Sequence, residues 1–321
     1  MSGAENTAGP GAVPGPSESD RLAVFVHPDQ EVVDNGRDTL RKIGDVATSL
    51  RRRPIAGIEL VAPTPATADE VAAVHDPEYV EAFVTGTPPS QARSAGLGWD
   101  EEFVQAVFAS TGGARDAAVR AYRQRTIAGS LSAGLHHARR EAGYGYCTFN
   151  GLVIAALAAR EAGARRIVIV DFDAHCGGGT AGLIAGVPEI EQVDVSVVRY
   201  DTYESRRDAV LLLATGEDYL ERCAQALEYV LDPDDVDLVI YNAGMDPHEG
   251  AGGALGITAE VLAERERMVF EWAEENDLPL AFVLAGGYTI GIDQRELVEL
   301  HRLTIAEAAR SVAVRNAATR A

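Results

Sequence analysis

Short apolar runs alternate with amphipathic stretches along nearly the whole chain after residue 20. In the run IVIV, residues 167 to 170, no polar residue alternates with the apolar ones, which is typical of a strand covered on both faces in a parallel sheet. The predicted strands are Leu22 to Val26, Gly57 to Val61, Ile127 to Leu131, Arg166 to Asp171, Val193 to Val198, Val236 to Tyr241 and Leu280 to Leu284.

Between these runs the apolar residues recur at helical spacing, and several stretches begin at Asp, Thr or Asn, residues that favour helix caps. Strands that alternate with helices in this way indicate an α/β fold: an open, mostly parallel sheet with helices on both faces. The predicted helices are Asp38 to Arg51, Ala68 to Ala73, Asp100 to Arg123, Gly151 to Gly163, Glu217 to Tyr229, Thr258 to Glu275 and Gln294 to Val314.

The alternation continues from residue 21 to residue 321 without a linker, a repeat or a low-complexity break, so we predict a single domain over 21–321. Residues 1–20 are rich in Gly, Pro, Ser and Ala and have neither a basic start nor an apolar segment. We interpret them as a disordered leader and not as a signal peptide. In an open parallel sheet, function is expected in the loops that follow the strands.

The loop after the fourth predicted strand begins with the sequence DFDAH. Side chains at alternating positions of an extended chain project to the same side. We therefore expect Asp171, Asp173 and His175 to project from one side of the chain. Carboxylates and an imidazole at the end of a strand make half of a metal site.

Residues that could take part in the same chemistry follow three other predicted strands. The third predicted strand leads to His136 and His137, the sixth to Asp246 and the seventh to Tyr288 behind two glycines. Histidine, aspartate and tyrosine side chains gathered at one sheet edge are typical of a metal-dependent hydrolase.

The composition of the chain bears on its binding partners and its cellular location. The 321 residues carry a net charge of −21, which argues against nucleic-acid binding because that depends on cationic side chains. Three cysteines form no disulfide framework, and no stretch is apolar enough to span a membrane, so a cytoplasmic location is expected. Whether the chain forms a homo-oligomer stays open.

As a set, the motifs resemble the histone deacetylase superfamily, which includes bacterial acetylpolyamine amidohydrolases. The resemblance implies an open sheet of the arginase-deacetylase type and a zinc-dependent amidohydrolase that acts on the linear amide bond of an N-acyl amine, either a small molecule or a lysine side chain. The segments that carry it are Ala66 to Phe83, Gly134 to Ala138, Gly143 to Asn150, Val170 to Thr180, Asn242 to Gly250 and Leu284 to Thr289.

The resemblance also implies a role for each motif residue. Three match ligands of Zn²⁺, a set that also suits Fe²⁺: Asp173, His175 and Asp246. Four match catalytic positions: His136 and His137 as the proton-transferring pair, Asp171 behind His136, and Tyr288 as donor to the developing oxyanion.

Weaker correspondences concern the substrate and a second ion. Asp100 falls where the family places a carboxylate at the rim of the site, and Gly145 with Tyr146 matches the wall of the substrate tunnel. A structural K⁺ site is implied by Asp171, Asp173, His175 and Ser196.

Two departures from the family pattern bear on the substrate. Cys176 and Gly178 replace the usual histidine and the usual Asp or Asn, so the support of His137 is expected to be missing and its ring less basic. The segment Val195 to Asp208 replaces the usual substrate-bordering loop, and Arg199 and Tyr200 predict a more polar, partly cationic pocket for a small or acidic N-acyl substrate.

Two alternatives remain. A binuclear manganese ureohydrolase of the arginase type needs further carboxylates, and neither Gly177 and Gly178 nor Asn242, Ala243 and Gly244 provide one. A non-catalytic descendant that binds acylated ligands is the other, because the support of His137 is expected to be missing.

Overall fold

The computed structural model describes residues 21–31, 37–132, 135–230 and 233–320. The predicted leader, 1–20, and Gly134 of the histidine motif lie outside the described residues. The described chain builds one sheet of eight strands, all parallel, in the order β2-β1-β3-β8-β7-β4-β5-β6. The strands are β1 Leu22–Phe25, β2 Ile58–Val61, β3 Ile127–Ser130, β4 Ile167–Asp171, β5 Ile190–Ser196, β6 Ala209–Leu213, β7 Leu238–Ala243 and β8 Leu280–Leu284.

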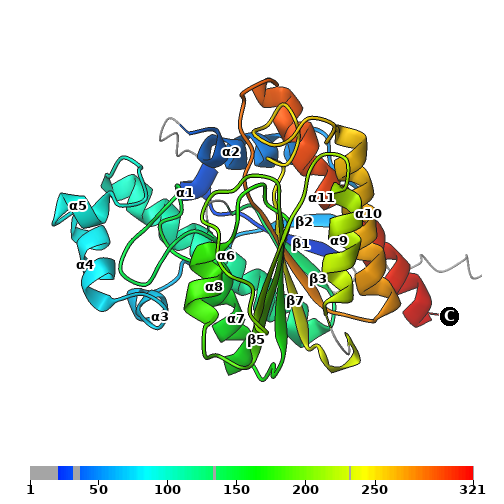
Figure 1. The fold of residues 1–321 in the computed structure, drawn as a ribbon, viewed down its shortest axis with the longest axis horizontal. Helices are drawn as coiled ribbons and strands as arrows, with labels where there is room; N and C mark the ends of the chain where they lie inside the picture. The colour runs from blue at the N-terminus through cyan, green and yellow to red at the C-terminus, as the bar shows by residue number, and fades with distance from the viewer. Residues whose placement is uncertain (1–20, 32–36, 133–134, 231–232, 321) are drawn as a thin grey trace, which may run out of the picture.

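Helices cover both faces of the sheet, as the alternating pattern predicts (Figure 1). One face packs on α2, α9, α10 and α11, and the other on α3, α4, α6, α7 and α8. None of the helices in the described ranges is both long and apolar enough to cross a bilayer. The helices are α1 Pro28–Glu31, α2 Asp38–Arg52, α3 Ala68–Ala72, α4 Pro77–Thr85, α5 Pro89–Ala92, α6 Glu101–Gln124, α7 Gly151–Glu161, α8 Gly178–Ile184, α9 Tyr219–Glu228, α10 Ala259–Glu275 and α11 Gln294–Arg320.

Strand β4 shows why its sequence is continuously apolar. Ile167 and Ile169 belong to the core on one face of the sheet, whereas Val168 and Val170 belong to the core on the other. All of these side chains are fully buried. Because both faces of β4 are covered, no alternation of polar and apolar residues could survive there.

The structure adds elements that the periodicity did not predict. Edge strand β6 is half-exposed and follows a charged stretch, so its sequence lacks the fully apolar signal of a central strand. Helix α8 begins in three consecutive glycines, which disfavour helix in isolation. Strand β5 begins at Ile190 and ends at Ser196, because the N–H groups of Val197 and Val198 donate to Ala174 instead.

Five strands that lie side by side in the sheet, β3, β8, β7, β4 and β5, send their following loops to the same edge. The loops that carry His136, Tyr288, Asp246, His175 and Asp201 therefore start next to one another. The parallel arrangement makes this possible, since all the carboxyl ends point the same way.

Candidate active site

Three side chains converge on one point at the carboxyl edge of the sheet. Asp173, His175 and Asp246 each offer one ligand atom, and these atoms all lie within 4.8 Å of one another. His175 Nδ1 lies 3.1 Å from Asp173 Oδ1 and 3.1 Å from Asp246 Oδ2. One imidazole nitrogen and two carboxylate oxygens make a three-ligand set that could hold a metal ion, so the structure brings the predicted ligands together.

Backbone N–H groups hold both carboxylates in place. Asp173 Oδ2 accepts a hydrogen bond from Gly286 N at 2.8 Å, and Asp246 Oδ1 accepts one from Ala174 N at 2.9 Å. Only glycine fits at position 286, because a Cβ there would lie 2.0 Å from Asp246 Oδ2. The oxygens that face His175 Nδ1 are Asp173 Oδ1 and Asp246 Oδ2, and Asp173 Oδ1 also accepts the backbone N–H of His175 at 3.0 Å.

The electrostatics of this cluster favour positive charge. Burial alone would lower the pKa of His175, but its hydrogen bonds to Asp173 and Asp246 and their charges outweigh burial and raise the pKa to about 11. Burial alone would raise the pKa of Asp173, but the cationic rings of His136 and His175 bring that pKa well below its usual range. A divalent cation would satisfy the same demand, so the residues present fit a metal ion.

His136 forms the predicted pair with Asp171. Its Nδ1 lies 2.8 Å from Asp171 Oδ2, and both side chains are buried. Asp171 is fixed in turn by Asn242, whose amide donates to the other carboxylate oxygen at 2.8 Å. The ring of His136 is therefore held with Nε2 on the side of Asp173, 3.5 Å from that carboxylate.

His137 also has a carboxylate partner, so the expected lack of support was wrong. Its Nδ1 lies 3.0 Å from Oδ2 of Asp201, whose side chain is only 1% exposed. Asp201 also accepts the backbone N–H of Gly179 at 3.2 Å and pairs with Arg139. The carboxylate comes from the segment after β5 and not from the loop after β4.

The absence of a side chain at Gly178 leaves room for Asp201 beside His137. A Cβ at position 178 would lie 2.2 Å from the backbone oxygen of Asp201. Asp201 itself has φ of 57°, a left-handed conformation that Asp and Asn adopt more readily than most residues. The missing side chain at 178 and the carboxylate at 201 are therefore two parts of one arrangement.

The two histidines differ in their preference for a proton. Burial and the charge of His136 lower the pKa of His137 to about 4, against the opposing influence of Asp201. Burial also acts on His136, but Asp171 and Asp173 outweigh it and raise its pKa to about 10. The expectation of a neutral His137 thus keeps its direction, while the cause is burial beside a second ring and not a missing carboxylate.

Aromatic side chains form the walls of the site. Gly145, Tyr146 and Tyr288 line the same pocket as His136, His137 and two of the candidate metal ligands, Asp173 and His175. The Tyr288 ring centroid lies 6.3 Å from that of His175. At the outer side Tyr200 lies 5.1 Å from the ring of His137 and stacks on the exposed Tyr144 with an interplanar angle of 3°.

Three predicted substrate residues are absent from the described lining of the pocket. The Asp100 carboxylate caps α6 by accepting the N–H of Phe103 at 2.7 Å, and Asp100 is not among the described residues that line the pocket. Arg199 is exposed and, like Tyr200, is not among the described residues that line the pocket, so a role for either in substrate binding stays a prediction. The arginines that reach the aromatic wall are Arg139, over Tyr144 at 4.9 Å, and Arg37, over Tyr146 at 4.5 Å.

Behind the site the structure adds a buried carboxylate that the motifs did not predict. Asp194 accepts hydrogen bonds from Ser196 at 2.6 Å and from Gly177 N at 2.7 Å. Burial and the charge of Asp171 raise the pKa of Asp194 well above its usual range. Ser196, expected at the K⁺ site, thus bonds to a second acid, and the K⁺ assignment stays a prediction.

A buried cation was also missed. Lys42 on α2 is fully buried, and burial lowers its pKa to about 8 although Asp246 and Asp173 act in the opposite direction. It is the only lysine in the sequence, and this rarity was the one signal that could have singled it out. Its charge partly offsets those of Asp173 and Asp246.

Nothing in the described residues adds the carboxylates of a binuclear site. A second metal ion would need another carboxylate near the end of β7, but Asn242, Ala243 and Gly244 are neutral. The Asn242 amide instead donates to Asp171. Within the described ranges, the cluster of Asp173, His175 and Asp246 is the one group with metal-binding geometry.

A buried histidine ties the histidine loop to helix α7 and makes stability depend on pH. His75 Nδ1 lies 2.7 Å from the carbonyl of Arg139, and Nε2 accepts the N–H of Asn150 at 2.9 Å, so only the neutral ring fits. Burial lowers its pKa to about 4, from the usual histidine value of about 6.5. The contribution of the neutral His75 ring to the free energy of unfolding is therefore complete above pH 6.5, and it is lost as the pH falls toward 4.

We expect this histidine to contribute a loss of about 2 kcal/mol in unfolding free energy between pH 7 and pH 5. Urea unfolding of the chain and of His75→Gln at both pH values measures it. The variant is expected to be less stable at pH 7 but to lose less on acidification. Equal losses in the two proteins would show that His75 is not the group responsible.

Several known proteins resemble this chain in sequence. Residues 37–209, more than half of the chain, match the model of the histone deacetylase domain. An uncharacterised protein of Picosynechococcus sp. is 37% identical over 246 residues, which cover 74% of this chain and 81% of that protein. Histone deacetylase 2 of Arabidopsis thaliana is 30% identical over 169 residues, covering 50% of this chain but only 43% of that relative.

The fold matches as well. The crystal structure of acetylpolyamine aminohydrolase from Burkholderia pseudomallei superposes with a TM-score of 0.73 at 18% identity, covering 89% of this chain and 98% of that one. The sheet is thus of the arginase-deacetylase type, as the motifs imply. The match of more than half of the chain to the histone deacetylase domain shows that the chain belongs to the histone deacetylase family.

Proposed function

We propose that this chain is a zinc-dependent amidohydrolase that removes an acetyl or another acyl group from an N-acyl amine. The observation that carries the proposal is one pocket lined by a metal-binding pair, Asp173 and His175, two carboxylate-supported histidines and Tyr288. Asp246 completes the ligand set. Fe²⁺ suits the same ligands.

When bound, the metal would supply Lewis acidity that polarises the acyl carbonyl and makes water more acidic. The chain's own residues handle the protons. In each histidine, Nδ1 is engaged by a carboxylate, so Nε2 is the nitrogen that exchanges a proton. The separated pKa values, about 4 for His137 and about 10 for His136, suit a neutral acceptor of the water proton and a charged donor to the leaving amine.

The proposal is tested with metal-quantified protein and a panel of N-acyl amines: an acetyl-lysine peptide, an acetylpolyamine, and acidic and aromatic N-acyl amines. We expect release of free amine from at least one of them with one metal ion per chain. Binding of the amides without hydrolysis would favour a non-catalytic descendant. Two Mn²⁺ ions per chain would contradict the mononuclear site.

The relocated carboxylate gives a sharper prediction. Replacing Asp201 with asparagine keeps a hydrogen-bond acceptor beside His137 Nδ1 but removes the charge. We expect kcat to fall by about 10- to 100-fold, the usual cost of losing a supporting partner, with the metal content unchanged. The pKa of His137 should fall further, because Asp201 raises it in the native protein, and the acid limb of the pH profile should move down accordingly.

Asp208→Asn is the matched control, since Asp208 belongs to the same segment but pairs with Arg206 at the surface. It should leave kcat unchanged. Gly178→Ala should reproduce the loss seen in Asp201→Asn, because the new Cβ displaces the backbone of residue 201. If kcat were unchanged in Asp201→Asn, His137 would not depend on this carboxylate.

A further inference from the structure

Two arginines lie over aromatic rings at the mouth of the catalytic pocket, where Tyr144 and Tyr146 stand. The guanidinium carbon of Arg37 lies 4.5 Å from the ring centroid of Tyr146, which lines the pocket. The guanidinium carbon of Arg139 lies 4.9 Å from the ring centroid of Tyr144, which stands 6.2 Å from the ring of His137. Arg37 is exposed and the Arg139 side chain is 52% exposed, so both cations can meet a ligand that enters from solvent.

The charges of these arginines are only partly compensated. Stacking on an aromatic ring holds a guanidinium group in place and leaves its N–H groups free to bind oxygen atoms. Arg139 shares its charge with Asp201, the buried carboxylate that also supports His137. Arg37 makes no ion pair with another described residue. Two guanidinium groups and one carboxylate therefore leave an excess of one positive charge at the mouth.

Carboxylates that could hold a cationic amine are missing from the described lining of the pocket. Asp173 is the one carboxylate in that lining, and it belongs to the metal cluster. Asp100, expected at the rim, caps α6 instead. A substrate whose amine half ends in a positive charge would therefore find no counter-charge among these residues.

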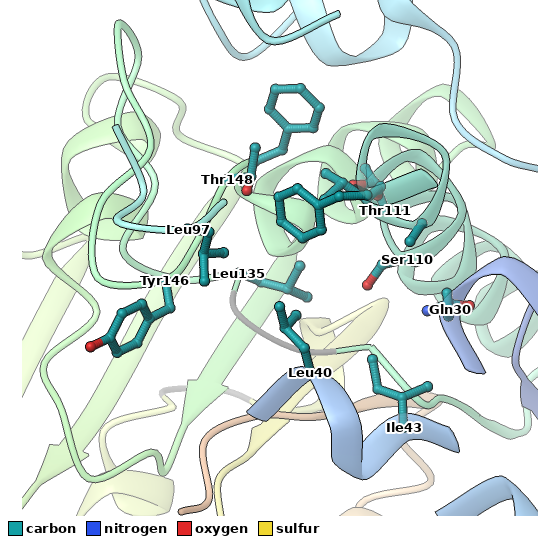
Figure 2. A pocket seen from close by; sticks show the side chains of 13 residues that line it. Gln30, Leu40, Ile43, Leu97, Ser110, Thr111, Leu135, Tyr146 and Thr148 are labelled. Atoms are coloured by element: carbon teal, nitrogen blue, oxygen red, sulfur yellow. Dashed lines mark hydrogen bonds between the residues drawn. The ribbon is translucent and has the colours of Figure 1, made fainter. Parts of the chain in front are cut away.

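The amine half of a long substrate extends outward, toward the two arginines. Behind Leu135, on the inner side, lies a cavity that Tyr146 also lines (Figure 2). It has about 30 Å³ of room, enough for one or two water molecules and too little for the tail of an amine. Figure 2 shows the Tyr146 hydroxyl directed away from this cavity. A substrate that is longer than the pocket therefore leaves it past Tyr146 and Tyr144.

We propose that the preferred substrate is an N-acyl amine whose amine half carries a carboxylate, and that Arg37 and Arg139 bind this carboxylate at the mouth. This inference rests on the proposed amidohydrolase function. Guanidinium groups bind carboxylates through parallel N–H···O bonds, and the excess of one positive charge matches the charge of one carboxylate. The net charge of −21 does not oppose this, because charges more than about 8 Å away are largely screened at physiological ionic strength.

N-acetyl ω-amino acids that differ in the number of methylenes before the carboxylate provide the test. Each acid is compared with its own primary amide, which has the same shape without the charge, and with an acetylated diamine of similar length. With the metal-loaded full chain, we expect kcat/KM of the best acid to exceed that of its amide by about 20-fold, or about fivefold for each arginine, and the diamine to rank last. No preference for the acid at any chain length would overturn the inference.

Variants of the two arginines localise the preference. Arg37→Gln and Arg139→Gln should each lower the ratio of acid to amide kcat/KM by about fivefold. The ratio is the proper readout for Arg139, because its pairing with Asp201 affects the turnover of every substrate alike. Arg37→Glu should invert the order, so that the acetylated diamine becomes the best substrate.

Arg160→Gln is the matched control. It removes the same charge from an arginine that pairs with Glu189, at the end of α7 that leads toward the start of β4 and not toward the carboxyl edge of the sheet. The control should leave the ratio unchanged, which separates contact at the mouth from the overall charge of the chain. An equal fall in Arg160→Gln and Arg37→Gln would overturn the inference.

Calorimetric binding adds a readout that does not need turnover: the best acid should bind the parent about fivefold more tightly than Arg37→Gln. If amides are hydrolysed and Arg37→Gln leaves the ratio intact, the inference fails and the proposed function stands. If no compound is hydrolysed but the acid binds in a manner that depends on Arg37, the proposed function fails and the carboxylate site stands. If the acid is neither hydrolysed nor bound, both fail.

Discussion

Replacing Asp246 with alanine is expected to abolish metal binding and hydrolysis together. Asp246 supplies one of three ligand atoms that converge within 4.8 Å, and its side chain is fully buried. With two ligands left, the site no longer meets the three protein ligands that catalytic zinc sites use. The loss should exceed the roughly 10- to 100-fold cost of removing an outer partner of a metal site.

Metal content measured by elemental mass spectrometry, beside kcat on the same preparation, checks this expectation. The parent should hold one ion per chain and the variant close to none. Asp237→Ala is a suitable control, because Asp237 accepts backbone N–H groups of Arg165 and Arg166 away from the site. A variant that kept stoichiometric metal would remove Asp246 from the ligand set.

The metal cluster could be predicted from sequence because its geometry is local. Asp173 and His175 stand two residues apart directly after β4, and Asp246 follows the adjacent strand β7. Once the strands are known to be parallel neighbours, their ends must meet. The pairing of Asp171 with His136 does not follow from neighbouring strands, because β7 and β8 lie between β4 and β3; the loop after β3 reaches across that edge of the sheet.

The partner of His137 could not be found in this way. Asp201 and Arg199 stand two residues apart in a loop without regular structure, where no periodicity indicates which of them turns inward; Asp201, with a left-handed backbone, does so. The sequence pointed to Arg199 as a pocket residue, whereas the structure exposes it. The sequence showed that Gly178 departs from the family pattern. Which residue takes the place of the missing side chain depends on the path of a distant segment.

At Asp100 the local sequence signal was a better guide than the resemblance to the family. Its place just before a predicted helix was a sound local signal, and the structure uses the side chain as the cap of α6. The resemblance to a rim carboxylate was the weaker of the two indications. The cavity behind Leu135 had no sequence signal at all, because Gln30, Ser110 and Leu135 come together only through the packing of α1, α6 and the histidine loop.

Replacing Tyr288 with phenylalanine is expected to keep the metal and slow turnover. Tyr288 lines the pocket together with Asp173 and His175, and its ring stands edge-on to His175 at an angle of 85°. Burial, with the charges of Asp246 and Asp173, raises the pKa of its hydroxyl, so the group stays protonated and can donate at any working pH. Loss of one donor to a developing oxyanion typically lowers kcat by about 10²- to 10³-fold.

Because that donation strengthens as negative charge develops, the loss should appear in kcat and not in KM. Elemental analysis should still find one metal ion per chain, which separates this variant from Asp246→Ala. Tyr229→Phe is the matched control: Tyr229 is 45% exposed at the end of α9, and its variant should match the parent in both constants. An unchanged kcat in Tyr288→Phe would show that another group donates to the oxyanion, and the role inferred for Tyr288 would be wrong.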